Sequence, residues 1–195
     1  MQMAIQTTRA MNLAHWLTQN VRRFPQRSAL VWRDRQWTWS EFDARVSAFS
    51  GVLAGAGVGS GTPVLVHSKN SNEMLESMFA VFRLGAVWVP TNFRLTPPEV
   101  VYMAETAHAE VFLCQSDFPG HAAAVQAACP GVKRLWLSGD ATARQDGPYV
   151  GALIDAAHGT SVPNAPVERD TPCWLFFTSG TTGRSKAAVL THGQM

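Results

Sequence analysis

The sequence predicts an α/β protein built on a mostly parallel sheet with helices on both faces. Between residues 62 and 137, short apolar runs of strand length alternate with segments whose apolar residues fall at helical spacing. Strands that alternate with helices are joined by right-handed crossovers, which gives parallel strands covered on both sides. The chain of 195 residues, 46% of them hydrophobic, is long enough to bury a sizeable core.

The segment before this alternation predicts a helix, a hairpin and a second helix. Apolar residues at helical spacing indicate a helix over 12–21. The stretch "SALVWRDRQWTW", residues 28–39, has two β-rich runs around a charged turn, which is typical of a hairpin. Thr38 lies three residues before Glu41 and forms a capping box with it, so a helix is expected from there to the glycines that begin at Gly55.

The alternating segment gives the sheet and its crossovers. The expected strands are 62–67, 86–90, 110–114 and 132–137. The expected helices between them are 70–86, 95–107 and 119–128. A second capping box, Thr96 with Glu99, and a proline in the first turn support the start of the middle helix.

The patterning fades over residues 138–172, which predicts a long irregular connection with one short helix near 149–158. We expect this connection to be an ordered crossing between two layers rather than a domain boundary. Two β-like runs follow, "CWLFFT" at 173–178 and "KAAVLT" at 186–191, with a Gly/Thr-rich loop between them. They favour strand–loop–strand over strand–loop–helix, because the second run is short and ends at His192 and a glycine.

Composition and charge exclude several classes of function. The formal net charge is +2 without a basic stripe, so an electrostatic nucleic-acid binder is not expected. No apolar run approaches the roughly 20 residues needed to span a bilayer, and the start lacks a signal-peptide pattern. A cytoplasmic protein is therefore expected. Cys114, Cys129 and Cys173 lack metal-ligand spacing and are interpreted as buried small hydrophobic residues, so no metal site is predicted.

The loop after residue 177 carries the strongest functional signal. A run of hydroxyl residues and glycines follows an apolar strand, and a basic pair follows the run. Glycines let a backbone approach a polyphosphate, hydroxyls and successive amides supply donors, and a lysine adds a mobile positive charge. The candidate phosphate-binding residues are Thr178, Ser179, Gly180, Thr181, Thr182, Gly183 and Lys186. The alternative to a phosphate-binding loop is a flexible surface turn of small residues.

Two common phosphate loops are excluded. The spacing of "GTTGRSK" does not match a Walker A loop. The glycine-rich "GAGVGSG" at 55–61 follows a helix and precedes a strand, which is the reverse of the dinucleotide-binding order.

The stretch "FFTSGTTGRSKAAVLTH" resembles the phosphate-loop signature of adenylate-forming enzymes, the superfamily of acyl-CoA synthetases, adenylation domains and luciferases. The positions that match the usual pattern [FY]-T-S-G-[ST]-T-G-x-P-K-G-V…T-H are Phe177 to Gly183, Lys186, Thr191 and His192. The chain departs at Ser185, where proline is usual, and at Ala187, where glycine is usual. Upstream segments are similar in order and spacing, so the resemblance covers about residues 10–195, and "GAVWVPTNFRLTPPE" is most like acyl-CoA synthetases.

The resemblance implies that the chain is the amino-terminal part of an AMP-binding domain, incomplete as it stands. Such enzymes use ATP and Mg²⁺ to convert a carboxylic acid, here a fatty or aromatic one, into an acyl-adenylate with release of pyrophosphate. Coenzyme A then takes the acyl group as a thioester. Residues Thr178 to Gly183 and Lys186 would hold the ATP phosphates. The resemblance places the catalytic residues, the metal ligand and the small carboxy-terminal domain beyond Met195, so this chain alone is expected to be inactive.

Three other readings stay open at this stage. The chain could be a non-catalytic interaction module of the same fold, could use luciferase-type oxidative chemistry, or could belong to a hydrolase or kinase of another fold. The last needs an acidic metal cluster near the loop, for which Glu168 and Asp170 are the nearby candidates. His192 is expected to have a capping or packing role. Because an incomplete sheet exposes edges, self-association or strand exchange between copies is also expected.

Overall fold

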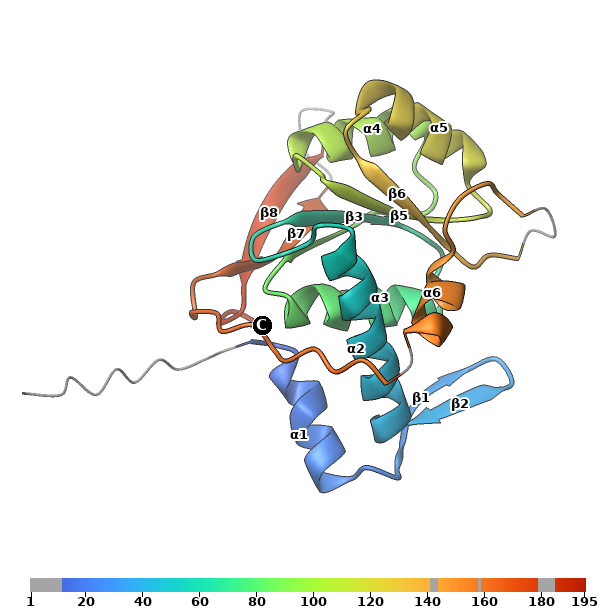
Figure 1. Ribbon diagram of the computed structural model, residues 1–195. Coiled ribbons are helices and arrows are strands. Elements are labelled where there is room, and N and C mark those ends of the chain that lie inside the picture. The colour runs from blue at the N-terminus through green and yellow to red at the C-terminus, as the bar shows by residue number, and fades with distance from the viewer. Residues whose placement is uncertain (1–11, 141–143, 158, 179–184) are drawn as a thin grey trace, which may run out of the picture.

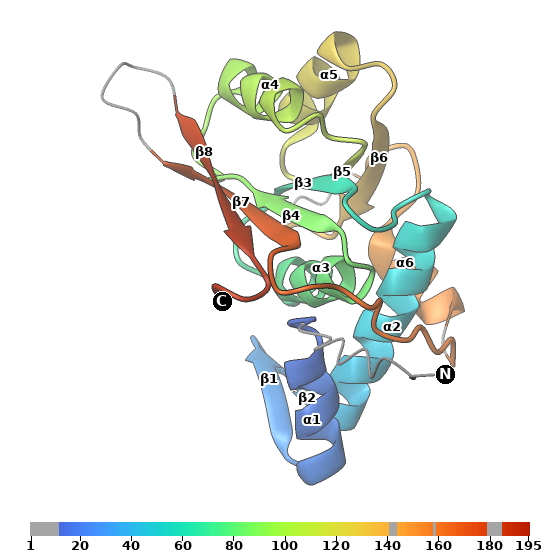
Figure 2. The same ribbon diagram turned by 90° about the vertical axis from the view of Figure 1, so that its left-hand side faces the viewer.

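The computed structural model describes residues 12–140, 144–157, 159–178 and 185–195 and shows a mixed α/β fold (Figures 1 and 2). The main sheet has six strands in the order β6-β5-β3-β4-β7-β8, and a separate two-stranded hairpin pairs β1 with β2. The strands are β1 (Ser28–Trp32), β2 (Arg35–Thr38), β3 (Pro63–His67), β4 (Val87–Pro90), β5 (Val111–Gln115), β6 (Lys133–Leu137), β7 (Pro172–Thr178) and β8 (Lys186–Thr191). The helices are α1 (His15–Arg23), α2 (Trp39–Gly55), α3 (Asn72–Arg83), α4 (Pro97–Thr106), α5 (Pro119–Ala128) and α6 (Val150–Ala156).

The predicted fold class is confirmed. Every neighbouring pair in the main sheet is parallel except β7 with β8, which is antiparallel. The expected strand–loop–strand arrangement around the glycine-rich loop is therefore correct. One hydrophobic core lies between the sheet and α2, α3 and α6, and a second lies between the sheet and α4 and α5. Figure 2 shows these helices on opposite faces of the sheet.

Local sequence explains where the helices begin. The Thr38 hydroxyl accepts a hydrogen bond from the Glu41 backbone N–H, and the Glu41 carboxylate accepts one from the Thr38 N–H, which closes the predicted capping box. The Glu99 carboxylate accepts from both the backbone N–H and the hydroxyl of Thr96. These contacts lower the pKa of Glu41 and Glu99 below the usual value of a glutamate. Ser71 caps α3 by accepting from the backbone N–H of Met74.

Buried ion pairs join α2 to α3 across their interface. The Arg45 guanidinium holds the Glu76 carboxylate in a fork, with Nε–Oε1 at 2.6 Å and Nη2–Oε2 at 3.1 Å. Arg83 donates to Asp43 and lies 3% exposed. The structure places Asp43 opposite a buried arginine, because α3 packs against that face of α2.

The connection between α6 and β7 crosses the outside of α2 and α3 as an extended strap, residues 159–171, and follows the brown trace in Figure 2. The Val162 N–H donates to the Ser47 hydroxyl at 2.7 Å. The Ala165 N–H donates to the carbonyl of Arg83, also at 2.7 Å. These bonds fix the strap to both helices.

The strap also holds the amino-terminal segment. The side-chain amide of Asn12 donates to the carbonyl of Ala165 at 3.0 Å, and the amide of Asn164 donates to the Thr18 hydroxyl at 3.1 Å. The helix α1 is thus attached to residues far along the chain, and it packs beside α2 (Figure 1).

Candidate functional site

The candidate site lies where β7 ends and β8 begins. Thr178 is the last residue of β7 and is paired in register with Lys186, the first residue of β8. Both residues are exposed, and their pairing fixes the two ends of the intervening loop. The other predicted phosphate-binding residues, Ser179 to Gly183, lie outside the described residues. The structure therefore places the two ends of the predicted site and leaves the middle as a prediction.

One aromatic contact and two hydrophobic cores anchor β7. The rings of Trp88 on β4 and Trp174 on β7 meet edge to face, with centroids 4.8 Å apart. Leu175 and Phe177 pack into the core beneath α4 and α5, whereas Trp174 packs against the opposite core. A strand fixed on both faces gives the loop that follows it a rigid base, as the sequence predicted from the apolar run.

The direction of β7 puts the two ends of this loop, Thr178 and Lys186, at the carboxyl edge of the parallel strands. Trp174 pairs with Trp88, and β7 continues to Thr178 whereas β4 ends at Pro90. The hairpin therefore extends past the carboxyl ends of the parallel strands, as Figure 2 shows. In open α/β sheets, ligands bind outside these carboxyl ends.

Helix α4 supports the exit of the loop. The Tyr102 hydroxyl donates to the carbonyl oxygen of Ser185 at 3.2 Å, immediately before Lys186. Tyr102 could not be identified from the sequence, because a tyrosine on a helix carries no signal for a contact 83 residues away. Its position makes it a support for the backbone that carries Lys186.

His192 closes the other end of the hairpin. Its Nδ1 accepts a hydrogen bond from the Leu13 N–H at 3.1 Å, and its ring packs edge to face on Phe82. The side chain is 2% exposed, and burial lowers the pKa of the imidazole. These contacts agree with the packing role expected for His192, which joins the end of β8 to the amino-terminal segment.

A polar cavity of about 530 Å³ lies at the same edge of the sheet, outside β3, β5 and β6. Lys69 donates to Asp117 at 3.0 Å and lies 3.7 Å from Asp140, which also pairs with Arg33. The hydrogen bond that Lys69 donates to Asp117 raises the pKa of Lys69, and the one that Asp140 accepts from Arg33 lowers the pKa of Asp140. Because these charges pair with one another, the cluster is organised for structure rather than for proton transfer.

The buried carboxylate of Glu73 completes this edge. It accepts from the Ser138 N–H at 2.6 Å and from the Ser138 hydroxyl at 2.9 Å. Burial raises the pKa of Glu73 in spite of these donors. The sequence reasoning missed the whole group, although a signal exists, because β3, β5 and β6 are each followed directly by polar residues.

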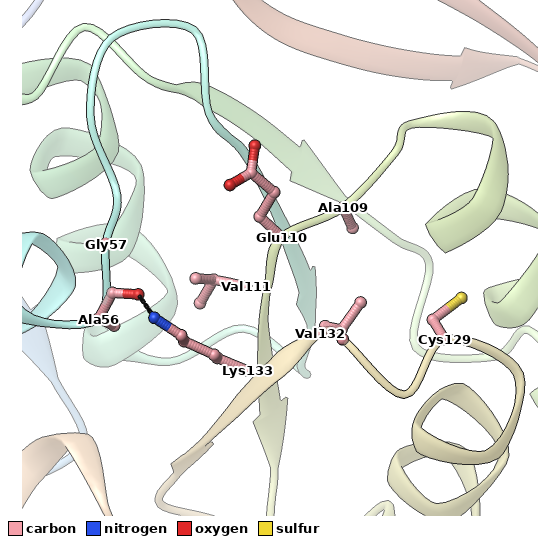
Figure 3. Close-up of a pocket in the computed structure, with 9 residues that line it drawn as sticks. Ala56, Gly57, Ala109, Glu110, Val111, Cys129, Val132 and Lys133 are labelled. Carbon is pink, nitrogen blue, oxygen red and sulfur yellow. Dashed lines mark hydrogen bonds between the residues drawn. The ribbon is translucent and has the colours of Figure 1, made fainter.

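A further pocket of about 380 Å³ lies at the opposite edge, at the amino ends of β5 and β6 (Figure 3). The Lys133 ammonium donates to the Ala56 carbonyl at 2.7 Å, and Glu110 and Cys129 also line the pocket. Cys129 is only half-buried, so the expectation of three buried cysteines holds for Cys114 and Cys173 alone. The pocket is far from the carboxyl ends of the strands and is not the candidate site.

The described residues do not fit a metal site beside the loop. Glu168 and Asp170 precede β7, so they lie at the opposite end of that strand from Thr178, about 20 Å away at the rise of an extended strand. Among residues 12–140, 144–157, 159–178 and 185–195, no group of three or more His, Cys, Asp or Glu side chains can hold a metal ion. The hydrolase or kinase reading, which needed these carboxylates near the loop, therefore loses its support.

Helices long and apolar enough to cross a membrane are absent from the part of the chain that the structure describes.

A family model described as AMP-binding enzyme matches residues 17–195. The chain is 33% identical over 187 residues to a feruloyl-CoA synthase of Amycolatopsis sp, covering 96% of this chain and 35% of that protein. It is 28% identical to an indoleacetate–CoA ligase of Aromatoleum aromaticum, with 95% of this chain and 36% of the relative covered. The chain thus spans about a third of the length of these curated relatives.

Solved structures agree with these relatives. The anthranilate CoA ligase AuaEII in complex with anthranoyl-AMP superimposes with a TM-score of 0.85 at 26% identity, covering 93% of this chain and 35% of that one. ATP-bound MatB from Rhodopseudomonas palustris gives a TM-score of 0.78 at 27% identity, with 94% and 35% covered. The amino-terminal domain of FACL13 from Mycobacterium tuberculosis gives 0.81 at 25% identity, with 93% and 44% covered.

Proposed function

Because the chain belongs to the AMP-binding enzyme family, we propose that the protein it represents activates a carboxylic acid with ATP and passes the acyl group to coenzyme A. In the first step a carboxylate oxygen attacks the α-phosphorus of ATP, forming an acyl-adenylate and releasing pyrophosphate. In the second, the thiol of coenzyme A attacks the activated carbonyl, giving a thioester, AMP and a proton. The single observation that carries this proposal is the anchored hairpin that presents Thr178 and Lys186 at the carboxyl edge of the sheet.

In this proposal the chain's own residues bind and position the ATP phosphates. Thr178 to Gly183 supply hydroxyl and backbone donors, and Lys186 neutralises charge on the β- and γ-phosphates. The Mg²⁺ ligand, the remaining catalytic groups and the acyl pocket are proposed to lie in other parts of the protein. Residues 1–195 would then form the amino-terminal part of the AMP-binding domain, and 138–172 its long connection.

An aromatic acid is the favoured substrate class. Three of the proteins named above carry the names of feruloyl, indoleacetate and anthranilate groups. Other relatives are medium- and long-chain fatty acid ligases, so a fatty acid is the second candidate. A cytoplasmic location stays an expectation from the sequence.

Lys186→Ala is the test of this proposal in the full-length protein. We expect the wild-type protein to exchange pyrophosphate into ATP when the carboxylic acid is present. The variant should bind ATP about 10- to 100-fold more weakly, because a hydrogen bond to a charged group contributes about 1.5–3 kcal/mol. Lys133→Ala is the matched control. Lys133 is an exposed lysine at the beginning of β6, and among the described contacts its ammonium hydrogen-bonds only to the Ala56 carbonyl. An equal loss of ATP affinity in Lys186→Ala and Lys133→Ala, or a wild-type protein without acid-dependent pyrophosphate exchange, would contradict the proposal.

The 195-residue chain by itself is expected to release no pyrophosphate in the same assay, because the acyl pocket and metal ligand are proposed to lie elsewhere. Acid-dependent turnover by the isolated chain would overturn that assignment.

Tyr102→Phe is expected to weaken ATP binding by about 2- to 10-fold, because the hydroxyl that holds the Ser185 carbonyl is lost and a neutral hydrogen bond contributes about 0.5–1.5 kcal/mol. Calorimetric titration of ATP measures the change. Tyr149→Phe is the control, since the Tyr149 hydroxyl accepts from the Gln145 N–H well away from the hairpin. If both variants bind ATP as the wild type does, Tyr102 does not position Lys186.

A further inference from the structure

The chain departs from the usual phosphate-loop signature at the exit of the loop. Ser185 stands where proline is usual, and Ala187 stands where glycine is usual. The ring of a proline fixes its own φ torsion, so a proline restrains the backbone without any long-range contact. A serine leaves that torsion free, and the next residue is Lys186, the cation proposed to contact the ATP phosphates. Another restraint is therefore needed to hold Lys186 in place.

Tyr102 supplies a restraint at the same residue. Its hydroxyl donates to the Ser185 carbonyl oxygen at 3.2 Å. That carbonyl and the Lys186 N–H belong to one planar peptide unit, so the hydrogen bond fixes the orientation of the unit from which β8 begins. A proline would restrain the φ torsion of residue 185, whereas Tyr102 restrains its ψ torsion.

The helix that carries Tyr102 is a rigid support. Val100, Met103 and Ala104 of α4 are buried in the core that α4 and α5 form with the sheet. The phenol of Tyr102 therefore extends from a helix that is packed along one face. A contact made from a packed helix is positioned more precisely than one made from a loop.

The second departure also favours an ordered exit. Ala187 is paired with Phe177 in the ladder between β7 and β8. Glycine weakens a strand because it loses more conformational freedom on ordering than any other residue. An alanine therefore favours a strand that begins at Lys186. In this chain the exit is held by a long-range hydrogen bond and by strand pairing instead of by a local proline.

We propose that Tyr102 and a proline at position 185 are interchangeable restraints on Lys186, so that either one positions the lysine and the second adds little. This inference rests on the proposed function, because ATP binding is what Lys186 serves. Tyr102 is a positioning residue, since it acts on Lys186 through the backbone. The backbone is compatible with proline: Ser185 is not among the described residues with positive φ, and no hydrogen bond of its N–H is found among the described residues.

ATP titration by calorimetry tests this inference in the full-length protein, with Tyr102→Phe combined with each of three residues at position 185. Ser185→Pro alone should tighten ATP binding by about 2- to 5-fold, because fewer backbone conformations compete with the bound one. Tyr102→Phe should weaken binding by less than about twofold in the Ser185→Pro background, against about 2- to 10-fold with serine. In the Ser185→Gly background the loss should be larger than with serine, because glycine adds backbone freedom.

Ser185→Ala is the matched control. It removes the hydroxyl and keeps the carbonyl that Tyr102 binds, so the effect of Tyr102→Phe should equal that with serine. An equal effect of Tyr102→Phe in the proline, serine and glycine backgrounds would overturn the inference, because a purely structural tyrosine would contribute the same in each. If circular dichroism shows that Ser185→Pro does not fold, the comparison of serine with glycine decides between the two outcomes.

Hydrogen exchange without ATP separates this inference from the proposed function. The amides of Lys186 and Ala187 should exchange faster in Tyr102→Phe than in the wild type, and adding Ser185→Pro should restore their protection. A full-length protein that binds no ATP would contradict the proposed phosphate contact, whereas this exchange pattern would still support the shared restraint. Exchange at these two amides that Tyr102→Phe does not change would overturn the inference, whatever the protein does with ATP.

Discussion

Replacement of Arg45 by alanine is expected to lower the free energy of unfolding by about 3–5 kcal/mol, because it leaves the Glu76 carboxylate buried without its counter-ion. The Glu76 side chain has no exposed surface, and the fork from Arg45 supplies its charge partner. The remaining donor is the Asn72 amide at 3.3 Å, which carries no charge. A domain of this kind is stable by about 5–15 kcal/mol, so the expected loss is a large part of the total. Urea unfolding followed by circular dichroism measures it.

The double variant Arg45→Met/Glu76→Met separates the charge effect from packing. Removing both charges leaves no unpaired group, so we expect a much smaller loss than in Arg45→Ala. The additional contact of Arg45 with Asp155, at 3.8 Å on the exposed side, should contribute little. If the single variant loses less than about 1 kcal/mol, the Glu76 carboxylate is reached by water and the buried-pair argument is wrong.

Acidification from pH 6.5 to pH 4 is expected to cost about 3 kcal/mol of stability through His67 alone. Burial, and then the neighbouring His121, lowers the pKa of His67 to about 4, against about 6.5 in the unfolded chain. The unfolded state therefore binds the proton first. The stabilisation is fully present above pH 6.5 and is lost as the pH falls toward 4. The magnitude follows from a difference of about 2.5 pKa units at about 1.36 kcal/mol each.

The surroundings of His67 explain why it resists protonation. The imidazole is fully buried at the end of β3, its Nδ1 lies 2.6 Å from the Thr91 hydroxyl, and its ring stacks on His121 at 4.4 Å between centroids. Its Nε2 has no hydrogen-bond partner among the described residues.

The variant His67→Asn tests this assignment. It removes the titrating ring and keeps an amide that can bond to Thr91. At each pH, subtracting the unfolding free energy of the variant from that of the wild type cancels the titration of groups that both proteins share. This difference should change by about 3 kcal/mol between pH 6.5 and pH 4. His121→Asn is the companion variant, because His121 is the titratable side chain that stacks on His67. If the free energy of unfolding depends on pH in the same way in the wild type and in His67→Asn, His67 does not titrate in this range.

The alternation of strands and helices could be predicted because its signals are local. The capping box of Thr38 and Glu41 and the charged turn between β1 and β2 depend on residues within a few positions of one another. The apolar run before Thr178 likewise predicts an anchored strand without any knowledge of its neighbours. These are the features in which prediction and structure agree.

The contacts that the sequence did not predict depend on which strands lie side by side. Lys69 and Asp117 follow β3 and β5, and they meet because those strands are neighbours in the sheet. Asp43 pairs with Arg83 because α3 crosses α2 at that position. Periodicity identifies a polar helix face and cannot say which element covers it. The loop itself was identified by composition and family resemblance, whereas its support by Tyr102 required the three-dimensional placement of α4.

The bond between Leu13 and His192 has a consequence for the order in which the chain folds on the ribosome. Its two residues are 179 positions apart, and Asn12 and Thr18 are held by the strap at similarly distant residues. At about 5–20 residues per second, roughly 10–40 seconds separate the synthesis of the two partners. During that interval α1 lacks its long-range hydrogen bonds, and Leu13 and Leu17 lack part of their final cover. Helix α1 therefore completes its packing only after β8 and His192 have been made.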